Sequence, residues 1–80
     1  MVQDRVRRFI KDELNWDGGG ELTDDFPLIE RQVLDSLGIF QLVSFLEEEF
    51  GIEVLDEELI PENFGTIEGI ARLVSAKRTG

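Results

Sequence analysis

Cysteine and histidine are both absent from the sequence. Without cysteine the chain has no disulfide framework, no thiol nucleophile and no thiolate metal ligand, so packing alone must stabilise the fold. Without histidine it lacks the usual proton shuttle near neutral pH, and no obvious base is available to activate a serine. We therefore predict that the protein is not an enzyme, and that the reactive atom of any thiol chemistry comes from an attached group.

Long apolar runs are also missing. None reaches the roughly 20 residues that a membrane-spanning helix requires, and no apolar segment of signal-peptide type follows the basic N-terminal region. A chain of 80 residues can bury about 60% of its unfolded surface, enough for one small core. We expect a single domain over residues 1–80 that is cytoplasmic and monomeric. Met1 and the basic C-terminal residues lead us to expect a stand-alone protein.

The formal charge is strongly negative, −10 from 18 acidic and 8 basic residues. Such a charge repels nucleic acids and anionic membranes and favours basic protein surfaces. We therefore expect a basic protein partner, with no nucleic acid and no membrane partner, although the acids could also serve only to keep a small domain soluble. Seven of the eight basic residues gather near the two ends of the chain: Arg5, Arg7, Arg8, Lys11, Arg72, Lys77 and Arg78.

Apolar residues at helical spacing predict a first amphipathic helix over roughly residues 2–15: Val2, Val6, Phe9, Ile10 and Leu14. Three glycines at positions 18–20 end it, because glycine loses the most backbone entropy in a helix. A long loop then runs to about Asp35. Loops of this length are uncommon in compact domains and are usually functional. We expect its apolar residues to pin it to the other helices: Leu22, Phe26, Leu28, Ile29 and Val33.

A second helix is predicted from Ser36 to Phe50, ended by Gly51 as a left-handed C-cap. Steps of about 100° per residue place one set of side chains toward the core: Ile39, Leu42, Val43, Leu46 and Phe50. The opposite face collects Leu37, Phe40, Gln41, Ser44, Glu47 and Glu48. An exposed leucine and phenylalanine ringed by acids are typical of a protein docking patch. The alternative is that the loop or the first helix covers them.

The sequence after Gly51 predicts a short helix and then a long one. Ile52 and Val54 lie in an extended connector, and Asp56 is expected to cap a short helix that runs to Ile60 and is stopped by Pro61. Residues 61–65 predict a tight turn with Phe64 pointing inward. Thr66 is a suitable N-cap for a last helix with a buried stripe at Ile67, Ile70, Leu73 and Val74. The predicted fold is all-α: a small four-helix bundle of three long helices and one short, with a long loop between helices one and two.

Ser36 stands where the long loop meets the second helix. Serine is a preferred helix N-cap, and Asp35-Ser36-Leu37 by itself is a weak motif. The motif does not indicate a hydrolase, because the sequence offers no histidine and no nearby buried lysine to activate the serine. A calcium loop starting at Asn15, with Asp17, Gly20 and Glu21, fails because Phe26 stands where the bidentate acid belongs. We therefore predict neither a catalytic residue nor a metal site.

A longer stretch makes the motif specific. Leu34-Asp35-Ser36-Leu37-Gly38 is followed by Leu42-Val43 and then by the segment from Leu46 to Ile52. This pattern resembles the acyl and peptidyl carrier protein family over nearly the whole chain, and in particular its stand-alone members. The family is known as a four-helix bundle in which a phosphopantetheinyl transferase moves 4'-phosphopantetheine from coenzyme A onto the serine of the Asp-Ser-Leu motif.

The resemblance implies that Ser36 is the attachment point, that Asp35 helps the transferase and its metal ion to engage, and that Leu37 makes the first hydrophobic contact. An acyl or aminoacyl cargo would ride as a thioester on the terminal thiol. A phosphodiester suits a helix N-terminus, where free N–H groups and the positive end of the dipole face it. In the family the second helix recognises basic patches on loading, synthase and tailoring enzymes, which matches the face of Leu37, Phe40, Gln41, Ser44, Glu47 and Glu48.

Four positions depart from the fatty-acid carriers. Gly38 and Gln41 replace residues that are usually acidic, Phe40 is bulkier than the usual aliphatic residue, and Val33 stands where glycine is common. We therefore expect a carrier of a secondary-metabolite pathway, polyketide or nonribosomal peptide, loaded by a separate adenylating enzyme or acyltransferase. The alternatives are an acyl carrier of primary fatty-acid synthesis and a noncovalent helical adaptor that uses the same acidic face.

Overall fold

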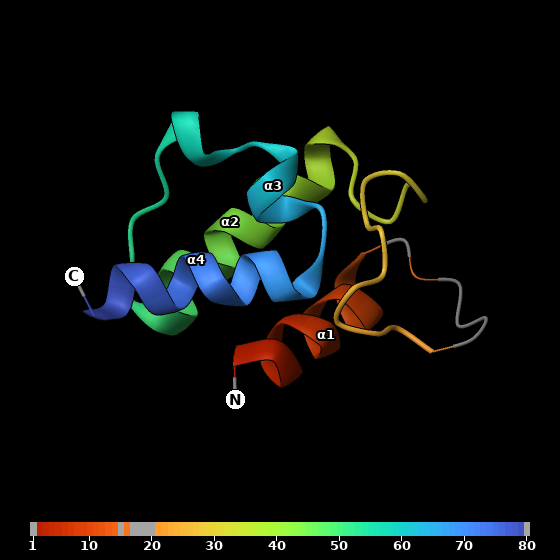
Figure 1. Ribbon diagram of the computed structural model, residues 1–80, viewed down its shortest axis with the longest axis horizontal. Coiled ribbons are helices and arrows are strands. Elements are labelled where there is room, and N and C mark those ends of the chain that lie inside the picture. Colours follow the sequence, from red (N-terminus) through yellow and green to blue (C-terminus); the bar gives the residue numbers. More distant parts are fainter. Residues whose placement is uncertain (1, 15, 17–20, 80) are drawn as a thin grey trace.

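The protein is an all-helical fold with one long irregular segment. The computed structural model describes residues 2–14, 16 and 21–79. Within them α1 spans Val2–Glu13, α2 Ser36–Phe50, α3 Pro61–Phe64 and α4 Ile67–Thr79, with a 3-10 turn, η1, at Asp56–Glu58 (Figure 1). The described ranges contain no strand. The predicted three long helices, one short helix and long loop before α2 are confirmed.

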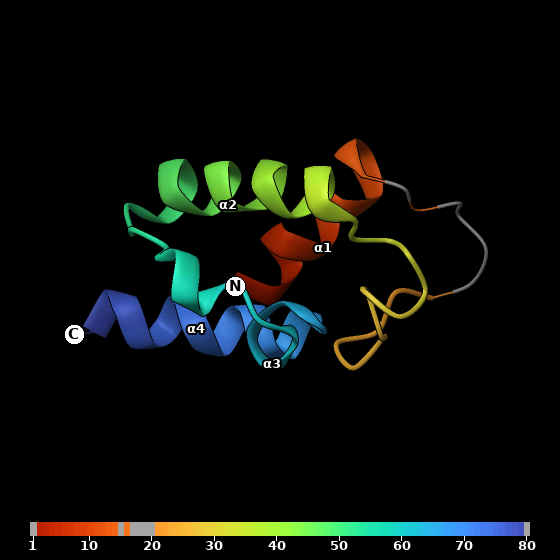
Figure 2. The same ribbon diagram turned by 90° about the horizontal axis from the view of Figure 1, so that it is seen from above.

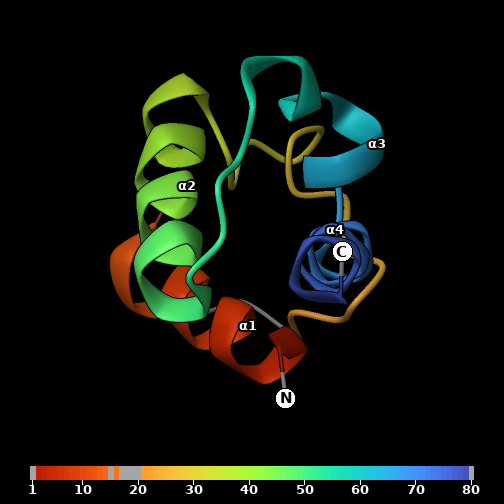
Figure 3. The same cartoon turned by 90° about the vertical axis from the view of Figure 1, so that its left-hand side faces the viewer.

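The helices surround a common core. Seen end on, α2 and α4 lie on opposite sides, α1 closes the bottom and α3 lies beside α4 (Figure 3). From above, α2 and α4 run in the same direction, and their N-terminal ends lie at the end of the molecule that holds the segment of residues 21–35 (Figure 2). Helix α4 contacts each of the other three helices. The start of α2 is therefore framed by this segment and by the α3–α4 corner.

The core is made by the stripes that the periodicity predicts. Eight helical side chains are at most 1% exposed: Val6, Ile10, Leu42, Leu46, Phe64, Ile67, Ile70 and Val74. On α2 the core centres on Leu42 and Leu46, while the other predicted core positions of that helix are half-buried. At the edge between α1 and α2 the rings of Phe9 and Phe45 stack with centroids 4.4 Å apart. Removal of this apolar area from water is the main force that holds the helices together.

The predicted helix signals are confirmed at two helix ends. Gly51 has φ 65°, and its N–H donates to the Glu47 carbonyl at 3.0 Å, which makes it the left-handed C-cap of α2. Thr66 Oγ1 accepts a hydrogen bond from the Gly69 N–H at 3.0 Å at the start of α4. Helix α1 ends at Glu13, slightly before the predicted end, which lies outside the described residues.

The predicted short helix from Asp56 to Ile60 is wrong. Asp56 begins a 3-10 turn that ends at Glu58, and Pro61 starts α3 instead of stopping a helix. Proline suits the first helical position, because its missing N–H would have no intrahelical partner there and its φ is already helical. The tight turn expected at residues 61–65 is thus a single helical turn, and Phe64 points inward at 1% exposure, as predicted.

Glu58 fastens η1 to the end of α4. Its Oε1 accepts hydrogen bonds from Lys77 Nζ at 2.7 Å and from the Leu55 N–H at 2.9 Å. The hydrogen bond from Lys77, followed by that from the Leu55 amide, lowers the pKa of Glu58 below its ordinary value of 4.5. The ionised carboxylate therefore helps to hold the connector between α2 and α3 in place.

Because the pKa of Glu58 is lower in the folded than in the unfolded chain, its contribution to stability is complete above about pH 4.5 and disappears as the pH falls through the folded pKa. We expect Glu58→Gln to lower the free energy of unfolding at neutral pH, and this difference from the wild type to shrink steadily below pH 4.5. Urea unfolding of both proteins across this range measures it. A difference that is independent of pH would contradict the assignment.

Candidate functional site

Ser36 is exposed and begins α2. The N-cap is the preceding residue: Asp35 has extended backbone angles, and its Oδ1 accepts a hydrogen bond from the Gly38 N–H at 2.7 Å. The capping role that serine could have filled therefore belongs to Asp35. No side-chain hydrogen bond within the described residues uses the Ser36 hydroxyl, so an exposed residue presents it without a protein partner.

The chain leaves the core immediately before this serine. Leu28 is fully buried, and Val33 and Leu34 are 5% and 2% exposed, whereas residues 35–37 are all exposed. The carbonyl of Leu28 accepts hydrogen bonds from both the Val33 and Leu34 N–H groups, at 2.8 and 3.1 Å. Its own N–H donates to the Gly65 carbonyl at 2.7 Å. The serine is thus presented from a segment that is anchored to the α3–α4 corner.

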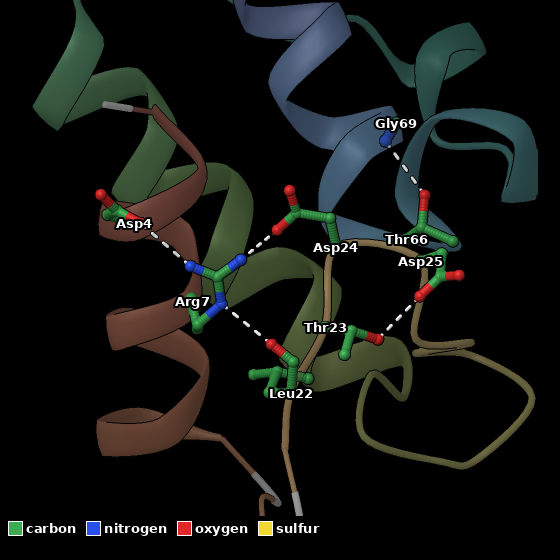
Figure 4. A network of polar contacts seen from close by, with 8 residues as sticks. All are labelled: Asp4, Arg7, Leu22, Thr23, Asp24, Asp25, Thr66 and Gly69. Atoms are coloured by element: carbon green, nitrogen blue, oxygen red, sulfur yellow. Dashed lines mark hydrogen bonds and ion pairs between the residues drawn. The ribbon is translucent and has the colours of Figure 1, made fainter.

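Arg7 of α1 holds the other half of that segment (Figure 4). Its Nε donates to the Leu22 carbonyl at 2.9 Å, and one terminal nitrogen pairs with the Asp24 carboxylate. The second terminal nitrogen donates to Asp4 within α1 at 3.0 Å. Asp24 in turn accepts the Glu68 N–H on its backbone carbonyl at 3.0 Å, which ties the same point to α4. Sequence reasoning missed this role, because it treated Arg7 only as part of a basic N-terminal cluster.

The expected docking of the loop is confirmed. Leu22 and Leu28 are at most 1% exposed, Val33 is 5% exposed, and the other two predicted anchors, Phe26 and Ile29, are partly buried against the core. The Trp16 and Phe26 rings meet edge to face with centroids 5.3 Å apart. These contacts explain how a segment without regular secondary structure keeps a defined path.

A hollow opens beside the serine. It has a volume of about 450 Å³ and is lined by Ile29, Gln32, Leu34, Asp35, Ser36 and Ile39. Its apolar lining comes from the anchored loop and the first turn of α2, while the polar groups lie at the start of the helix. The hollow could therefore take a group that is part polar and part apolar and is linked to the Ser36 oxygen.

The outward face of α2 is uncovered. Leu37 and Phe40 are 66% and 63% exposed, and Gln41, Ser44 and Glu48 are exposed as well. The alternative that the loop or α1 covers the two apolar side chains is therefore wrong. Glu47 differs from its neighbours, because it is half-buried and its Oε2 accepts the Val54 N–H at 3.0 Å. This carboxylate also stabilises the connector that follows α2.

Gly38 is a packing position in this fold. It is buried, and a Cβ built there would lie 3.2 Å from Asp35 Oδ1 and 3.7 Å from Leu14 Cδ2. A larger side chain would crowd the capping carboxylate, so the acid common in fatty-acid carriers does not fit here without movement. The residue in the left-handed conformation that glycine prefers is Gln32, with φ 62°, and not Val33, which is buried.

Two kinds of site receive no support from the described residues. They contain no group of three or more acidic side chains placed to hold a metal ion. Of the calcium register rejected above, Glu21 is exposed, while positions 15, 17 and 20 lie outside the described residues. None of the helices in the described ranges is both long and apolar enough to cross a lipid bilayer.

Comparison with protein families gives one match, to the family described as "Phosphopantetheine attachment site", over residues 4–74. The chain belongs to this carrier family. Its members hold a prosthetic group and do not catalyse reactions themselves, so the expectation of a non-enzyme is confirmed. The expected prosthetic group, phosphopantetheine, is confirmed by the same match.

Several curated proteins resemble the carrier. It is 38% identical over 53 residues to a probable acyl carrier protein, PigG, of Serratia sp. (strain ATCC 39006), covering 66% of this chain and 61% of that protein. The match therefore spans less than two thirds of that relative. It is 35% identical over 57 residues to an acyl carrier protein of Solidesulfovibrio magneticus, covering 71% and 72% of the two chains. With an acyl carrier protein of Clostridium acetobutylicum it shares 41% over 58 residues, covering 72% and 74%.

A solved structure shares the fold. A chain in the structure described as "Crystal structure of FAD-dependent dehydrogenase" superposes with a TM-score of 0.79 at 28% identity. The match covers 86% of the carrier and 97% of that chain. The two chains are therefore of similar length and share nearly the whole helical arrangement.

The residues at the start of α2 fit a phosphopantetheine group. An exposed hydroxyl is present at Ser36. The first N–H groups of a helix have no intrahelical acceptor, and of those in α2 the Gly38 N–H is already taken by Asp35 Oδ1, which leaves the N–H groups before it for an anion. An anionic phosphodiester is favoured there by those donors and by the helix dipole. The hollow beside Ser36 supplies the apolar surface that the rest of such a group can contact.

We expect Arg7→Gln to lower the free energy of unfolding by about 1–2 kcal/mol, because the Leu22 carbonyl and Asp24 lose a charged donor. The Leu28 N–H donates to the Gly65 carbonyl and the Glu68 N–H donates to the Asp24 carbonyl, so both hydrogen bonds join the loop to the α3–α4 corner. These two amide protons should exchange faster in this variant. Urea unfolding and hydrogen exchange measure the two effects.

Arg8→Gln is the matched control. Its side chain is 86% exposed and lies 3.7 Å from Asp12 on the same helix, so its loss should change stability by less than about 0.5 kcal/mol. Equal effects of the two substitutions would show that Arg7 does not anchor the loop.

Proposed function

We propose that Ser36 carries the 4'-phosphopantetheine group, and that the protein delivers an acyl or aminoacyl thioester between the enzymes of a secondary-metabolite pathway. The observation that supports this most is the exposed position of Ser36 where the chain leaves the core, with a hydroxyl that is not used to cap α2. It lies inside the stretch that matches the attachment-site family. The prosthetic group supplies the thiol that a chain without cysteine lacks.

Attachment requires little chemistry from the carrier itself. The Ser36 oxygen forms the new bond to phosphorus, 3',5'-ADP leaves from coenzyme A, and the transferase accepts the hydroxyl proton. Asp35 keeps one carboxylate oxygen on the Gly38 N–H, and its other oxygen is free to face the transferase and its metal ion. Leu37, 66% exposed, provides the first apolar contact beside the reacting hydroxyl.

The family implies a phosphopantetheinyl transferase and a loading enzyme as partners. We propose that the loading enzyme is an adenylating enzyme or an acyltransferase, and that synthase or tailoring enzymes with basic patches follow it. The proposed contact surface is the outward face of α2: Leu37, Phe40, Gln41, Ser44, Glu47 and Glu48. Electrostatic steering by an acidic surface speeds encounter, while modest affinity allows one carrier to visit several enzymes in turn.

The choice of a secondary-metabolite pathway rests on the α2 residues. Gly38 is packed against the capping carboxylate, and Phe40 and Gln41 replace an aliphatic and an acidic residue on the exposed face. This surface is less acidic and more apolar than that of fatty-acid carriers. A flavin-dependent dehydrogenase is one tailoring enzyme to test, since a chain of the same fold and similar length occurs in a structure described as one.

Primary fatty-acid synthesis is the second candidate function. It is favoured by the relatives from Solidesulfovibrio magneticus and Clostridium acetobutylicum, which are named simply as acyl carrier proteins. A noncovalent helical adaptor would use the same exposed Leu37 and Phe40. The adaptor differs from both carrier functions in one respect, because it would tolerate the loss of the Ser36 hydroxyl.

Incubation with coenzyme A, magnesium and a broad-specificity phosphopantetheinyl transferase should increase the mass of the intact protein by one phosphopantetheine. Ser36→Ala should abolish the increase. Ser44→Ala, which removes an exposed hydroxyl from the same helix, should leave it unchanged. Intact-mass spectrometry of the three proteins decides, and an unmodified wild type beside a modified known carrier would refute the proposal.

Glu48→Lys should slow modification by the transferase several-fold at low ionic strength, and the effect should shrink as salt screens the charge. Glu48 suits this test better than Glu47, whose carboxylate also binds the Val54 N–H. Glu57→Lys makes the same charge change at an exposed position in η1, away from the α2 face. Initial rates over a salt series measure the effect, and equal slowing by both variants would argue against a specific contact surface.

A further inference from the structure

Gln32 has an unfavourable backbone conformation close to the proposed attachment site. Its φ is 62°, and within the described residues no other non-glycine residue has a positive φ. Side chains with a Cβ are disfavoured in this left-handed region, whereas glycine would adopt it without strain. A strained residue of this kind persists when its surroundings enforce it, and such residues cluster at ligand sites. The question is therefore what the side chain of Gln32 does.

The surroundings enforce the turn at Gln32 from both sides. The Gln32 N–H donates to the Ile29 carbonyl at 3.0 Å, and the next two N–H groups, of Val33 and Leu34, both donate to the Leu28 carbonyl. Leu28, Val33 and Leu34 are buried. The chain must therefore reverse at Gln32 to return to the core before α2 begins. Glycine would satisfy the same geometry, so packing does not explain the glutamine.

The Gln32 side chain is placed to act on a group attached to Ser36. It is exposed and lines the same hollow as Ser36, together with Ile29, Leu34 and Ile39. Across residues 2–14, 16 and 21–79, no hydrogen bond joins its carboxamide to another side chain or to the backbone. A polar group that is free in the apoprotein and faces a partly apolar hollow is available for a ligand.

The chemistry of the hollow matches that of the arm. Phosphopantetheine begins with an anionic phosphodiester, continues with a geminal dimethyl group, and then carries a hydroxyl and two amides. A carboxamide donates hydrogen bonds to phosphodiester or amide oxygens without adding a negative charge next to Asp35. The side chains of Ile29 and Ile39 offer apolar surface to the methyl groups.

We propose that Gln32 is a positioning residue that donates from its carboxamide to the phosphate end of the arm and holds the arm against the hollow. The inference rests on the proposed function, namely that Ser36 is the attachment point. It also gives a reason why glutamine and not glycine stands at φ 62°, because the side chain contributes a contact that glycine cannot make.

The test compares the apo and holo forms of isotope-labelled protein by NMR, with an unlabelled arm added from coenzyme A. In the wild type, attachment should shift the side-chain amide signal of Gln32, and the arm methyl protons should show contacts with Ile29 and Ile39. Gln32→Gly should lose those contacts, yet should raise the folding equilibrium constant of the apoprotein about fivefold because the backbone strain is relieved.

Gln32→Glu keeps the size of the side chain but replaces its donors by a carboxylate that repels the phosphodiester, so the arm contacts should be lost here too. Gln3→Glu, the same change on α1, is the matched control and should retain them. A modified wild type whose arm shows no contact with the hollow, or a Gln32→Gly variant that keeps the contacts, overturns the inference and leaves the proposed function intact. A wild type that gains no mass overturns both.

Discussion

The path of the chain into α2 depends on one guanidinium group, that of Arg7. It satisfies the Leu22 carbonyl and pairs with Asp24, two polar groups of a segment that has no regular secondary structure. Loop carbonyls that are buried near a core need hydrogen-bond partners. With these contacts made on one side and the Gly65 carbonyl bonded on the other, the segment can bury Leu22 and Leu28 and deliver the next residues to a defined place.

Because the loop is held in this way, the residues at the start of α2 have distinct roles. The residues up to Leu34 are held in the core, Asp35 caps the helix, and Ser36 and Leu37 extend into solvent. A group linked to Ser36, as proposed, would extend from a segment that is held by hydrogen bonds and buried side chains. Helix α4 supports this arrangement, because it contacts α1, α2 and α3. It also donates from the Glu68 N–H to the Asp24 carbonyl and from Lys77 to the Glu58 carboxylate.

Much of this could be predicted from the sequence. Periodicity placed α1, α2 and α4, and Gly51 and Thr66 were correctly assigned as caps, because these signals act over a single helical turn. The short helix was misplaced, since a proline both stops one helix and starts another, and only the position of Phe64 in the core decides between the two. Glu47 was assigned to the outer face, but its carboxylate turns to the Val54 amide.

The sequence by itself determined the helical stripes, the acidic surface, the lack of an internal thiol or imidazole, and the Asp-Ser-Leu motif that places the chain among phosphopantetheine carriers. Each of these is a local or compositional property. The tertiary structure alone decided that Arg7 holds the loop, that Leu37 and Phe40 stay uncovered, and that Gln32 adopts a left-handed turn beside Ser36. The Arg7 contacts join residues far apart in the chain, and the turn at Gln32 is set by where Leu28, Val33 and Leu34 are buried in the core, so no local pattern of side chains encodes either.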